Sequence, residues 1–419
     1  MSIATVLFFL WGFVTSLNDI LIPHLKGIFS LNYGQVMMVQ FAFFSSYFIF
    51  ALPSGKLVDW RGYKQTMVIG LIVMATGALL FLPAASLASF PLFLAALVIL
   101  AAGITALQVS ANPYVTNLGP VATSASRLNL AQAFNSLGTT VAPLFGSALI
   151  LGAIQASPAT LKSFSAMALQ AYRAEQASSV RLPYLGIALL LLVLAVAIAL
   201  IKLPTTDFTR DFRPGELASR PAGSIWKQPY LLMATLGIFV YVGAEVSIGN
   251  LLVSYMGLPN IAALPAATAG YFLMVYWGGA MVGRFIGSAI LQKVRTGWLL
   301  GLAAIGAFVL VITTLFTSGH VAMAAVLAVG FCNSIMFPSI FTLGIQDLGP
   351  LTSKGSSLLI ASILGGAIVP KLQGILANHI GLQPSFILPA ICYIYIAIFG
   401  IMAIRRPIAR DALISTDSI

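Results

Sequence analysis

Charged side chains are scarce in this chain. They make up 7% of its 419 residues, whereas a soluble globular domain carries about 25%. Hydrophobic residues make up 59%, which is more than an aqueous core needs, so the composition excludes an ordinary soluble protein and indicates an integral membrane protein. The net charge of +11 does not indicate a nucleic-acid partner, because the basic residues are scattered through short loops instead of clustering on one face.

Cysteine and histidine are scarce as well. The two cysteines, Cys332 and Cys392, both lie in long apolar runs, which argues against a disulfide framework or a metal cluster. The three histidines lie near the ends of such runs and are poorly placed to relay protons across a membrane. The sequence has no nucleophile-elbow, zinc-protease or P-loop motif and no dinucleotide fingerprint between a strand and a helix, so neither an enzyme nor a cofactor is expected.

Long apolar segments, by contrast, are abundant. A helix that crosses a bilayer needs about 20 mostly apolar residues. The segments that meet this length are 3–25, 35–57, 64–86, 90–117, 127–153, 182–203, 228–256, 268–292, 297–317, 320–346, 355–378 and 383–404. They predict an all-α integral membrane protein with twelve transmembrane helices.

The longest polar stretch between spans separates the sixth span from the seventh. Residues 203–227 combine proline, glycine and charge, as a solvated linker does. We therefore expect four parts: an N-terminal six-helix bundle at 1–203, a linker at 204–227, a C-terminal six-helix bundle at 228–404 and a tail at 405–419.

The distribution of lysine and arginine predicts the orientation. With the N-terminus placed in the cytoplasm, fourteen of these residues fall in the inner loops and tail and four fall in the outer loops. Inner loops ordinarily carry this excess. Both termini and the linker are therefore predicted to be cytoplasmic, with the chain in a cell membrane, such as a bacterial inner membrane.

The two halves also resemble each other in sequence. LGTTVAP at 137–143 matches LGGAIVP at 364–370, and QVSANP at 108–113 aligns with NSIMFP at 333–338. Corresponding spans follow the same order and start on the same side, which indicates two pseudo-symmetric bundles related by an axis along the membrane normal. This arrangement is typical of a transporter whose site lies between the halves, near the midplane.

Two carboxylates lie well inside the predicted spans. Asp19 is in the first span and Glu245 is in the seventh, which the repeat makes its counterpart. A charge inside the bilayer is costly, and it ordinarily faces a cavity, a partner or an ion. Asp19 and Glu245 are therefore candidate cation-coupling residues, although each could instead be a protonated carboxyl that fixes helix packing.

Neutral amides gather in the predicted spans. They are Asn18, Gln108, Asn112, Asn129, Gln132, Asn135, Asn250, Asn333 and Gln373. Gln108 and Asn112 share one helix face because they are four residues apart. A single amide can serve as interhelical glue, but so many of them suit a polyhydroxylated neutral solute, whose ring could stack on Trp277.

The segment SGKLVDWRGYKQ, residues 54–65, joins the second and third spans. Asp59 lies there among basic residues that include Arg61 and Lys64, next to a turn expected at Gly62 and after Gly55. These opposite charges predict an ionic latch between helices in one conformation of a transporter. The loop is thus a candidate gating element.

These motifs resemble the major facilitator superfamily. The 54–65 loop is similar to the G-x-x-x-D-x-x-G-[RK]-[RK] signature of that superfamily. Within it, FFLWGFVTSLNDILIPHLK, LQVSANPYVTNLGP and RLNLAQAFNSLGTTVAP resemble the fucose–galactose–glucose symporter family, and YVGAEVSIGNLL, YWGGAMVGRFIG and NSIMFPSIFTLGI resemble its glucose/galactose branch. The resemblance covers nearly the whole chain.

This resemblance implies sugar uptake driven by a cation gradient. The family's coupling aspartate in the first helix corresponds to Asp19, and Asn112 and Asn135 correspond to the polar cavity. The fucose transporter has a glutamate where this chain has Gln108, so one titratable site is missing, and Glu245 could replace it. We expect Asp19 to bind Na⁺ with oxygens of Asn18, Gln108 and Asn112, or else to carry a proton; Na⁺ is slightly favoured because Gln108 cannot titrate.

The sequence thus predicts a monomeric symporter of a glucose- or galactose-type hexose that works by alternating access. The candidate sugar ligands are Gln108, Asn112, Gln132, Asn135, Glu245, Asn250, Trp277, Asn333 and Gln373. Proton-coupled uptake of N-acetylglucosamine or fucose is the alternative within this class. A drug/proton antiporter and a sugar-sensing receptor are the alternatives outside it, and saturable counterflow or competition by sugars would separate them.

Overall fold

The structure is a computed structural model that describes residues 1–29, 33–87, 89–149, 181–203 and 223–405, with a few isolated residues between 164 and 172. The described side chains do not include those of residues 2, 17–38, 40, 143–144, 146–149 and 266–267. The expected linker at 204–227 and the tail at 405–419 fall mostly outside the described residues.

The described chain is built from helices. In the first half these are α1 (Ser2–Phe29), α2 (Tyr33–Ser86), α3 (Phe90–Thr116), α4 (Ser124–Leu149) and α7 (Arg181–Leu200). In the second half they are α9 (Pro229–Met256), α10 (Ala266–Ile290), α11 (Thr296–Phe316), α12 (Gly319–Asn333), α13 (Met336–Ile345), α14 (Thr352–Ala361), α15 (Gly365–Ile380) and α16 (Ile387–Ile404). Short 3₁₀ turns include η1 (Val121–Thr123), η2 (Ile225–Lys227), η4 (Ser362–Leu364) and η5 (Pro384–Phe386).

Each of the twelve expected spans corresponds to one of these helices or to part of one. The second and third spans are joined in α2, where the backbone turns at Gly62 with φ 81°, a conformation that favours glycine. The tenth span is divided into α12 and α13, and the eleventh into α14 and α15. Nine helices of the described chain are long and apolar enough to cross a membrane, so the chain is a multi-pass membrane protein.

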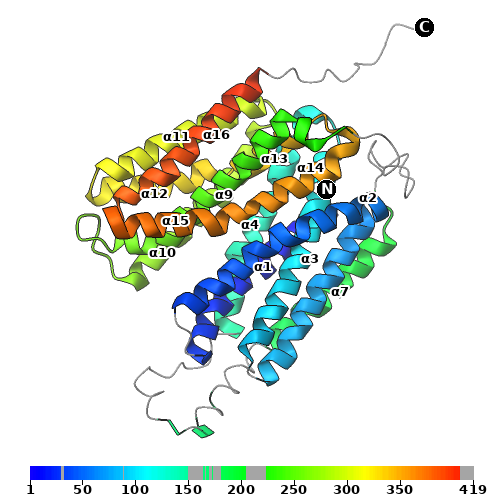
Figure 1. The fold of residues 1–419 in the computed structure, drawn as a ribbon, viewed down its shortest axis with the longest axis horizontal. Helices are drawn as coiled ribbons and strands as arrows, with labels where there is room; N and C mark the ends of the chain where they lie inside the picture. Colours follow the sequence, from blue (N-terminus) through cyan, green and yellow to red (C-terminus); the bar gives the residue numbers. More distant parts are fainter. Residues whose placement is uncertain are drawn as a thin grey trace.

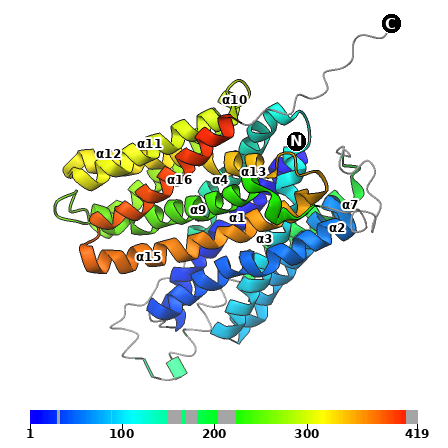
Figure 2. The same ribbon diagram turned by 45° about the horizontal axis from the view of Figure 1, so that its top comes forward.

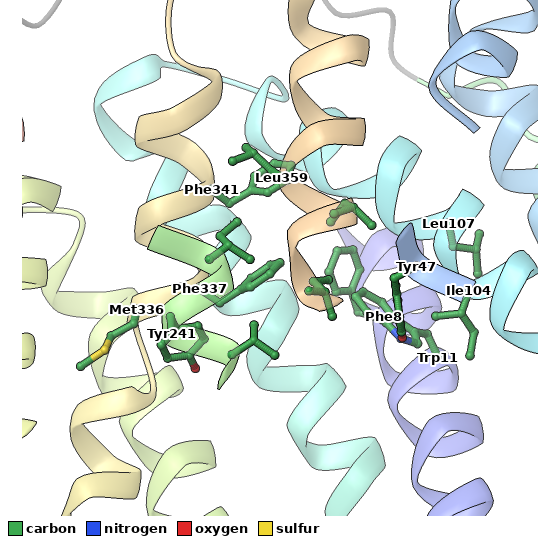
Figure 3. Close-up of a cluster of buried hydrophobic side chains, with 14 of the residues drawn as sticks. Phe8, Trp11, Tyr47, Ile104, Leu107, Tyr241, Met336, Phe337, Phe341 and Leu359 are labelled. Atoms are coloured by element: carbon green, nitrogen blue, oxygen red, sulfur yellow. The ribbon is translucent and has the colours of Figure 1, made fainter. Parts of the chain in front are cut away.

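The helices lie in two groups. Figure 1 shows α1, α2, α3 and α7 together on one side, with α9, α11, α12, α15 and α16 on the other. The turned view in Figure 2 keeps the same separation. Buried apolar side chains of both groups form one continuous cluster. Figure 3 shows part of it, with Phe8, Trp11 and Tyr47 from the first group and Tyr241 and Phe337 from the second.

Two prolines create hydrogen-bond acceptors inside this packing. A proline has no N–H to donate, so the carbonyl four residues earlier has no intrahelical partner. Pro113 frees the carbonyl of Val109, which accepts a hydrogen bond from the Ser356 hydroxyl of α14 at 2.9 Å. Pro338 similarly lies four residues after Ser334, whose carbonyl accepts from another helix, and α12 ends just before this point.

The two groups of helices are joined by hydrogen bonds near the end of the molecule that carries the N-terminus (Figure 1). The Ser126 hydroxyl of α4 donates to the Ser288 carbonyl of α10 at 2.7 Å, and the Ser288 hydroxyl donates back to the Ser126 carbonyl at 3.1 Å. The Ser356–Val109 bond joins α14 to α3 in the same way. This end of the interface between the halves is therefore closed.

Candidate functional site

A buried ion pair lies in the second half. Glu245 of α9 is 9% exposed, and its Oε1 lies 3.9 Å from Nη2 of Arg284 on α10. Both helices are apolar enough to span the membrane, where an unpaired charge is costly. Arg284 offsets part of the cost of a charged Glu245 inside the protein, and breaking such a pair ordinarily destabilises a fold.

Three tyrosines and an asparagine surround this pair. The Tyr276 hydroxyl donates to the Glu245 carbonyl at 3.4 Å and accepts from the Asn333 amide at 2.9 Å. The Tyr393 hydroxyl donates to Oδ1 of Asn333 at 2.8 Å, and the Tyr241 hydroxyl donates to its backbone carbonyl at 3.1 Å. Asn333, a predicted sugar ligand, thus holds the tyrosines beside Glu245 and is itself fully buried.

Arg284 also reaches across to the first half. Its Nη1 donates to the Ser136 hydroxyl and lies 3.5 Å from the Gln132 carbonyl, both on α4. Its Nε donates to the Ser334 carbonyl at 3.3 Å, which Pro338 leaves without a helical donor. One guanidinium therefore connects Glu245 to a helix of the opposite half.

Asn129 completes this contact from the other side. Its amide on α4 donates to the Arg284 carbonyl on α10 at 2.7 Å. Gly287, one turn further along α10, leaves the room for this approach, because a Cβ there would lie 3.1 Å from Nδ2 of Asn129 and 2.2 Å from the Ile335 side chain. The α4–α10 contact is thus a close one, made by polar groups and a glycine.

Gln108 and Asn112 lie one turn apart on α3 and are buried, at 3% and 0% exposed. Both polar atoms of the Asn112 amide are without a hydrogen-bond partner in the part of the chain that the structure describes. A buried amide is ordinarily satisfied by protein, water or a ligand. Asn112 therefore marks a polar position inside the first half that can accept a water, a cation or a solute hydroxyl.

The other predicted residues of the first half lie on α4 or on α1. Gln132 is 5% exposed and contributes its carbonyl to the Arg284 contact. The Asn135 amide donates to the Phe8 carbonyl of α1 at 2.9 Å, so Asn135 holds α1 against α4. Asn18 and Asp19 belong to α1, and their side chains lie outside the described residues.

Asn250 and Trp277 lie farther along α9 and α10. Asn250 is exposed, and the Trp277 ring, 39% exposed, packs against Gly249, where a Cβ would lie 3.0 Å from the ring. Trp277 also contacts the Tyr276 ring edge-on, with centroids 5.1 Å apart. An accessible aromatic face next to an amide is a suitable surface for a sugar ring.

Gln373 has a different environment from the other predicted ligands. It is fully buried in α15, and its Nε2 lies 3.4 Å from the Ser385 hydroxyl of η5. Its Oε1 has no hydrogen-bond partner among the described residues. The hydrogen-bond partner of Gln373 thus belongs to the second half, as Gln373 itself does, and no hydrogen bond in the described chain joins Gln373 to Gln108 or Glu245.

The predicted gating loop lies against α14 of the opposite half. The carboxylate of Asp59 accepts a hydrogen bond from the Ser353 hydroxyl. Burial raises the pKa of the Asp59 carboxyl above its ordinary value, and the Ser353 hydrogen bond and the charge of Lys354 oppose part of that rise. Gly55 lies against Ser357, where a Cβ would overlap the hydroxyl.

The basic residues of this loop have partners in their own half. Arg61 lies over the Trp60 ring, 4.0 Å from its centroid. The Lys64 ammonium donates to the Ala199 carbonyl of α7 at 2.8 Å. The polar contact between the halves at this loop is therefore the hydrogen bond that the Ser353 hydroxyl, next to Lys354, donates to Asp59; Arg61 and Lys64 do not take part in it.

Sequence reasoning missed Arg284. The predicted spans contain six basic residues, and four of these lie at a span end or next to one. Arg284 and Lys371 are the two that lie in the interior of a span, Arg284 in the span at 268–292. The cost of a charge in the bilayer applies to arginine as it does to aspartate. A search of the spans for cations as well as carboxylates would have found it.

Comparison with known proteins identifies the family. The Major Facilitator Superfamily profile matches residues 4–362. The chain is 51% identical to the "Glucose/galactose transporter" of Brucella abortus, over 95% of this chain and 92% of that protein. It is 37% identical to the "L-fucose-proton symporter" of Escherichia coli, over 94% and 90% of the two chains.

A solved structure has the same fold. The crystal structure of the Major Facilitator Superfamily transporter FucP in the outward conformation superimposes with a TM-score of 0.88 at 34% identity, covering 96% of this chain and 98% of that one. This match and the relatives above confirm the predicted fold class, and they confirm a transporter and not an enzyme. The chain belongs to the Major Facilitator Superfamily and, within it, to the fucose–galactose–glucose:cation symporter family.

Proposed function

We propose that this protein is a cation-coupled symporter that carries a hexose of the glucose/galactose type into the cell by alternating access. The names of its relatives, glucose/galactose transporter and L-fucose-proton symporter, support a sugar as the solute. The observation that carries the mechanism is the position of Arg284, which pairs with Glu245 and bonds to α4 of the opposite half. A charged group that links a buried carboxylate to the other bundle suits a carrier whose halves must separate and rejoin.

The solute site in this proposal lies between the halves, around the buried amides. Gln108 and Asn112 supply hydrogen-bonding groups from α3, Asn250 supplies an amide from α9, and Trp277 supplies an accessible ring. Gln132 and Asn135 support this site through the α4 contacts, and Asn333 supports it through the tyrosines. Gln373 of α15 is a further proposed ligand, because its Oε1 has no partner among the described residues.

Asp19 is the proposed coupling residue, with Na⁺ slightly favoured over H⁺. Gln108 is a ligand that does not titrate, and it stands where the fucose transporter has a glutamate. Glu245 is the other intramembrane carboxylate, and it has a cation, Arg284, beside it. A neutralised Asp19 lowers the cost of moving this region through an occluded state, so that solute and cation cross together.

Opening towards the side of the termini requires the closed contacts to break. These are the reciprocal Ser126–Ser288 bonds, the Ser356–Val109 bond, the Asp59–Ser353 bond and the bonds of Arg284 to α4. With both termini in the cytoplasm of a cell membrane, as we propose from the positive-inside rule, the structure represents a carrier closed to the cytoplasm. A monomer is sufficient for this cycle, because both halves belong to one chain.

Counterflow tests this function without any cation gradient. Liposomes that contain the purified protein and unlabelled glucose should take up labelled glucose in a saturable manner, and unlabelled galactose should compete. Counterflow of only fucose or only N-acetylglucosamine would mean that this sugar is the solute, and not glucose or galactose. Absence of counterflow with all four sugars would contradict the proposal and would favour a receptor or a drug antiporter.

A further inference from the structure

A cavity of about 230 Å³ lies at the closed end, between the two halves. The first half contributes Val121, Ala122 and Ser124, at the start of α4. The second half contributes residues 291–297, between α10 and α11, together with the ends of α13 and α16. The cavity is much larger than a single water needs, and separation of the halves at this end would take it apart.

The lining carries positive charge and hydroxyl groups. Lys293 and Arg295 contribute two cations, Ser124 and Thr296 contribute hydroxyls, and no aspartate or glutamate lines the cavity. Lys293 and Arg295 are exposed, and neither side chain has a hydrogen bond or an ion pair with another residue of the described chain. The cavity is thus complementary to an anion.

The internal repeat provides an independent reason to expect an anion there. In the first half, the loop after the second span presents the Asp59 carboxylate to Ser353, at the start of α14. The equivalent loop of the second half, residues 287–297, lies against the start of α4, and it contains no acidic residue. The contact that the first-half loop makes with α14 therefore includes a carboxylate, Asp59. The equivalent contact of the second-half loop with α4 has a cavity lined by two cations instead.

We propose that this cavity binds a phosphate-bearing anion, which stabilises the closed arrangement of the two halves. Phosphate oxygens accept hydrogen bonds from arginine, lysine and hydroxyl groups, and the free N–H groups at the start of α11 add to this attraction. Since the ligand would touch both halves, its binding favours the state in which the cavity exists. The phosphate can belong to a free phosphate compound or to an anionic lipid headgroup.

Thermal unfolding in nanodiscs tests the proposal and distinguishes the two sources. The first arm uses phosphatidylcholine nanodiscs with added inorganic phosphate, compared with chloride at the same ionic strength. The second arm replaces part of the lipid by phosphatidylglycerol and omits phosphate. The test variant is K293Q/R295Q, and the control is K202Q/K227Q, which changes two exposed basic residues that do not line the cavity.

We expect a rise in Tm on the order of 2 °C or more with the ligand, which K293Q/R295Q abolishes and K202Q/K227Q retains. A rise in the first arm assigns the site to free phosphate, and a rise in the second arm alone assigns it to the lipid. Equal responses of the two double variants, or no response in either arm, would overturn the proposal. The outcome does not depend on which sugar or coupling cation the protein uses.

Discussion

Arg284 lies at a position where a single side chain is connected to both halves of the protein. Its guanidinium balances Glu245, bonds to Ser136 on α4 and satisfies the Ser334 carbonyl. Lysine could not replace these bonds, because an ammonium lacks the planar fork that donates in several directions. At the scale of the residue, this arginine is the cation that opposes the cost of burying a Glu245 charge.

Replacing Arg284 tests this directly. In R284Q, Glu245 would be a buried carboxylate without a counter-charge, and the loss of one partner of a buried pair costs about 3–5 kcal/mol. We expect a clear fall in Tm and loss of sugar accumulation. The double variant E245Q/R284Q should recover most of the stability without recovering accumulation, and a single variant as stable as the parent would show that the pair has no such role.

Asp19 provides a second prediction at this scale. D19N removes the titratable, cation-binding carboxylate but keeps the size of the side chain. We expect that labelled sugar no longer accumulates against its gradient, while counterflow continues. Gradient-driven accumulation at the parental level in D19N would eliminate Asp19 as the coupling residue, and continued counterflow in D19N is the control for general damage to this region.

The sequence was sufficient to select the carboxylates and amides as candidate residues, but it did not predict which residues they contact. Glu245, Gln108 and Asn112 could be found because polar groups are unusual in apolar spans. In the structure, the Asn333 amide is hydrogen-bonded to Tyr276 and Tyr393, and Gln373 contacts Ser385 of its own half. These contacts depend on how helices distant in sequence pack together. Such distances do not follow from the spacing along one helix.

At the scale of the helix, the prolines determine where the halves can attach to each other. Pro113 removes an intrahelical bond of α3, and the freed Val109 carbonyl becomes the acceptor for Ser356 of α14. The apolar segments predicted all twelve spans, because length and hydropathy suffice for that. They did not predict the division of the tenth span into α12 and α13 or that of the eleventh into α14 and α15, which depend on local backbone breaks.

The Ser356 contact predicts a shift in conformation. S356A leaves the Val109 carbonyl, freed by Pro113, without a donor in the closed state, which costs about 1–3 kcal/mol. Opening at this end lets water satisfy the carbonyl, so the open population should increase about five-fold or more. Spin labels at Lys202 and Trp298, one on each half and both exposed, would report this as a longer distance in pulsed electron resonance.

A serine in the same helix provides the control. The Ser110 hydroxyl of α3 donates to the Ala106 carbonyl of its own helix at 2.7 Å, so S110A removes a buried hydroxyl without removing a contact between the halves. We expect S110A to keep the parental distance distribution. Identical distributions for S356A and the parent would contradict a role for this bond in closing the interface.

At the scale of the whole molecule, two helix bundles meet through buried apolar side chains of both halves and through polar contacts at one end. Asp59–Ser353, Ser126–Ser288 and the bonds of Arg284 are among these polar contacts. Alternating access requires such contacts to break and reform. The repeat predicts the solute site deeper in the same interface.

The most direct test of cation-coupled sugar symport is uptake of labelled glucose into liposomes that contain the purified protein. One sample receives an inward Na⁺ gradient at equal pH, and a matched sample receives a pH gradient without Na⁺. The account predicts accumulation above the equilibrium level with the Na⁺ gradient, and loss of that accumulation in D19N. Accumulation with the pH gradient alone would contradict Na⁺ coupling, and equilibration without accumulation in both samples would contradict symport.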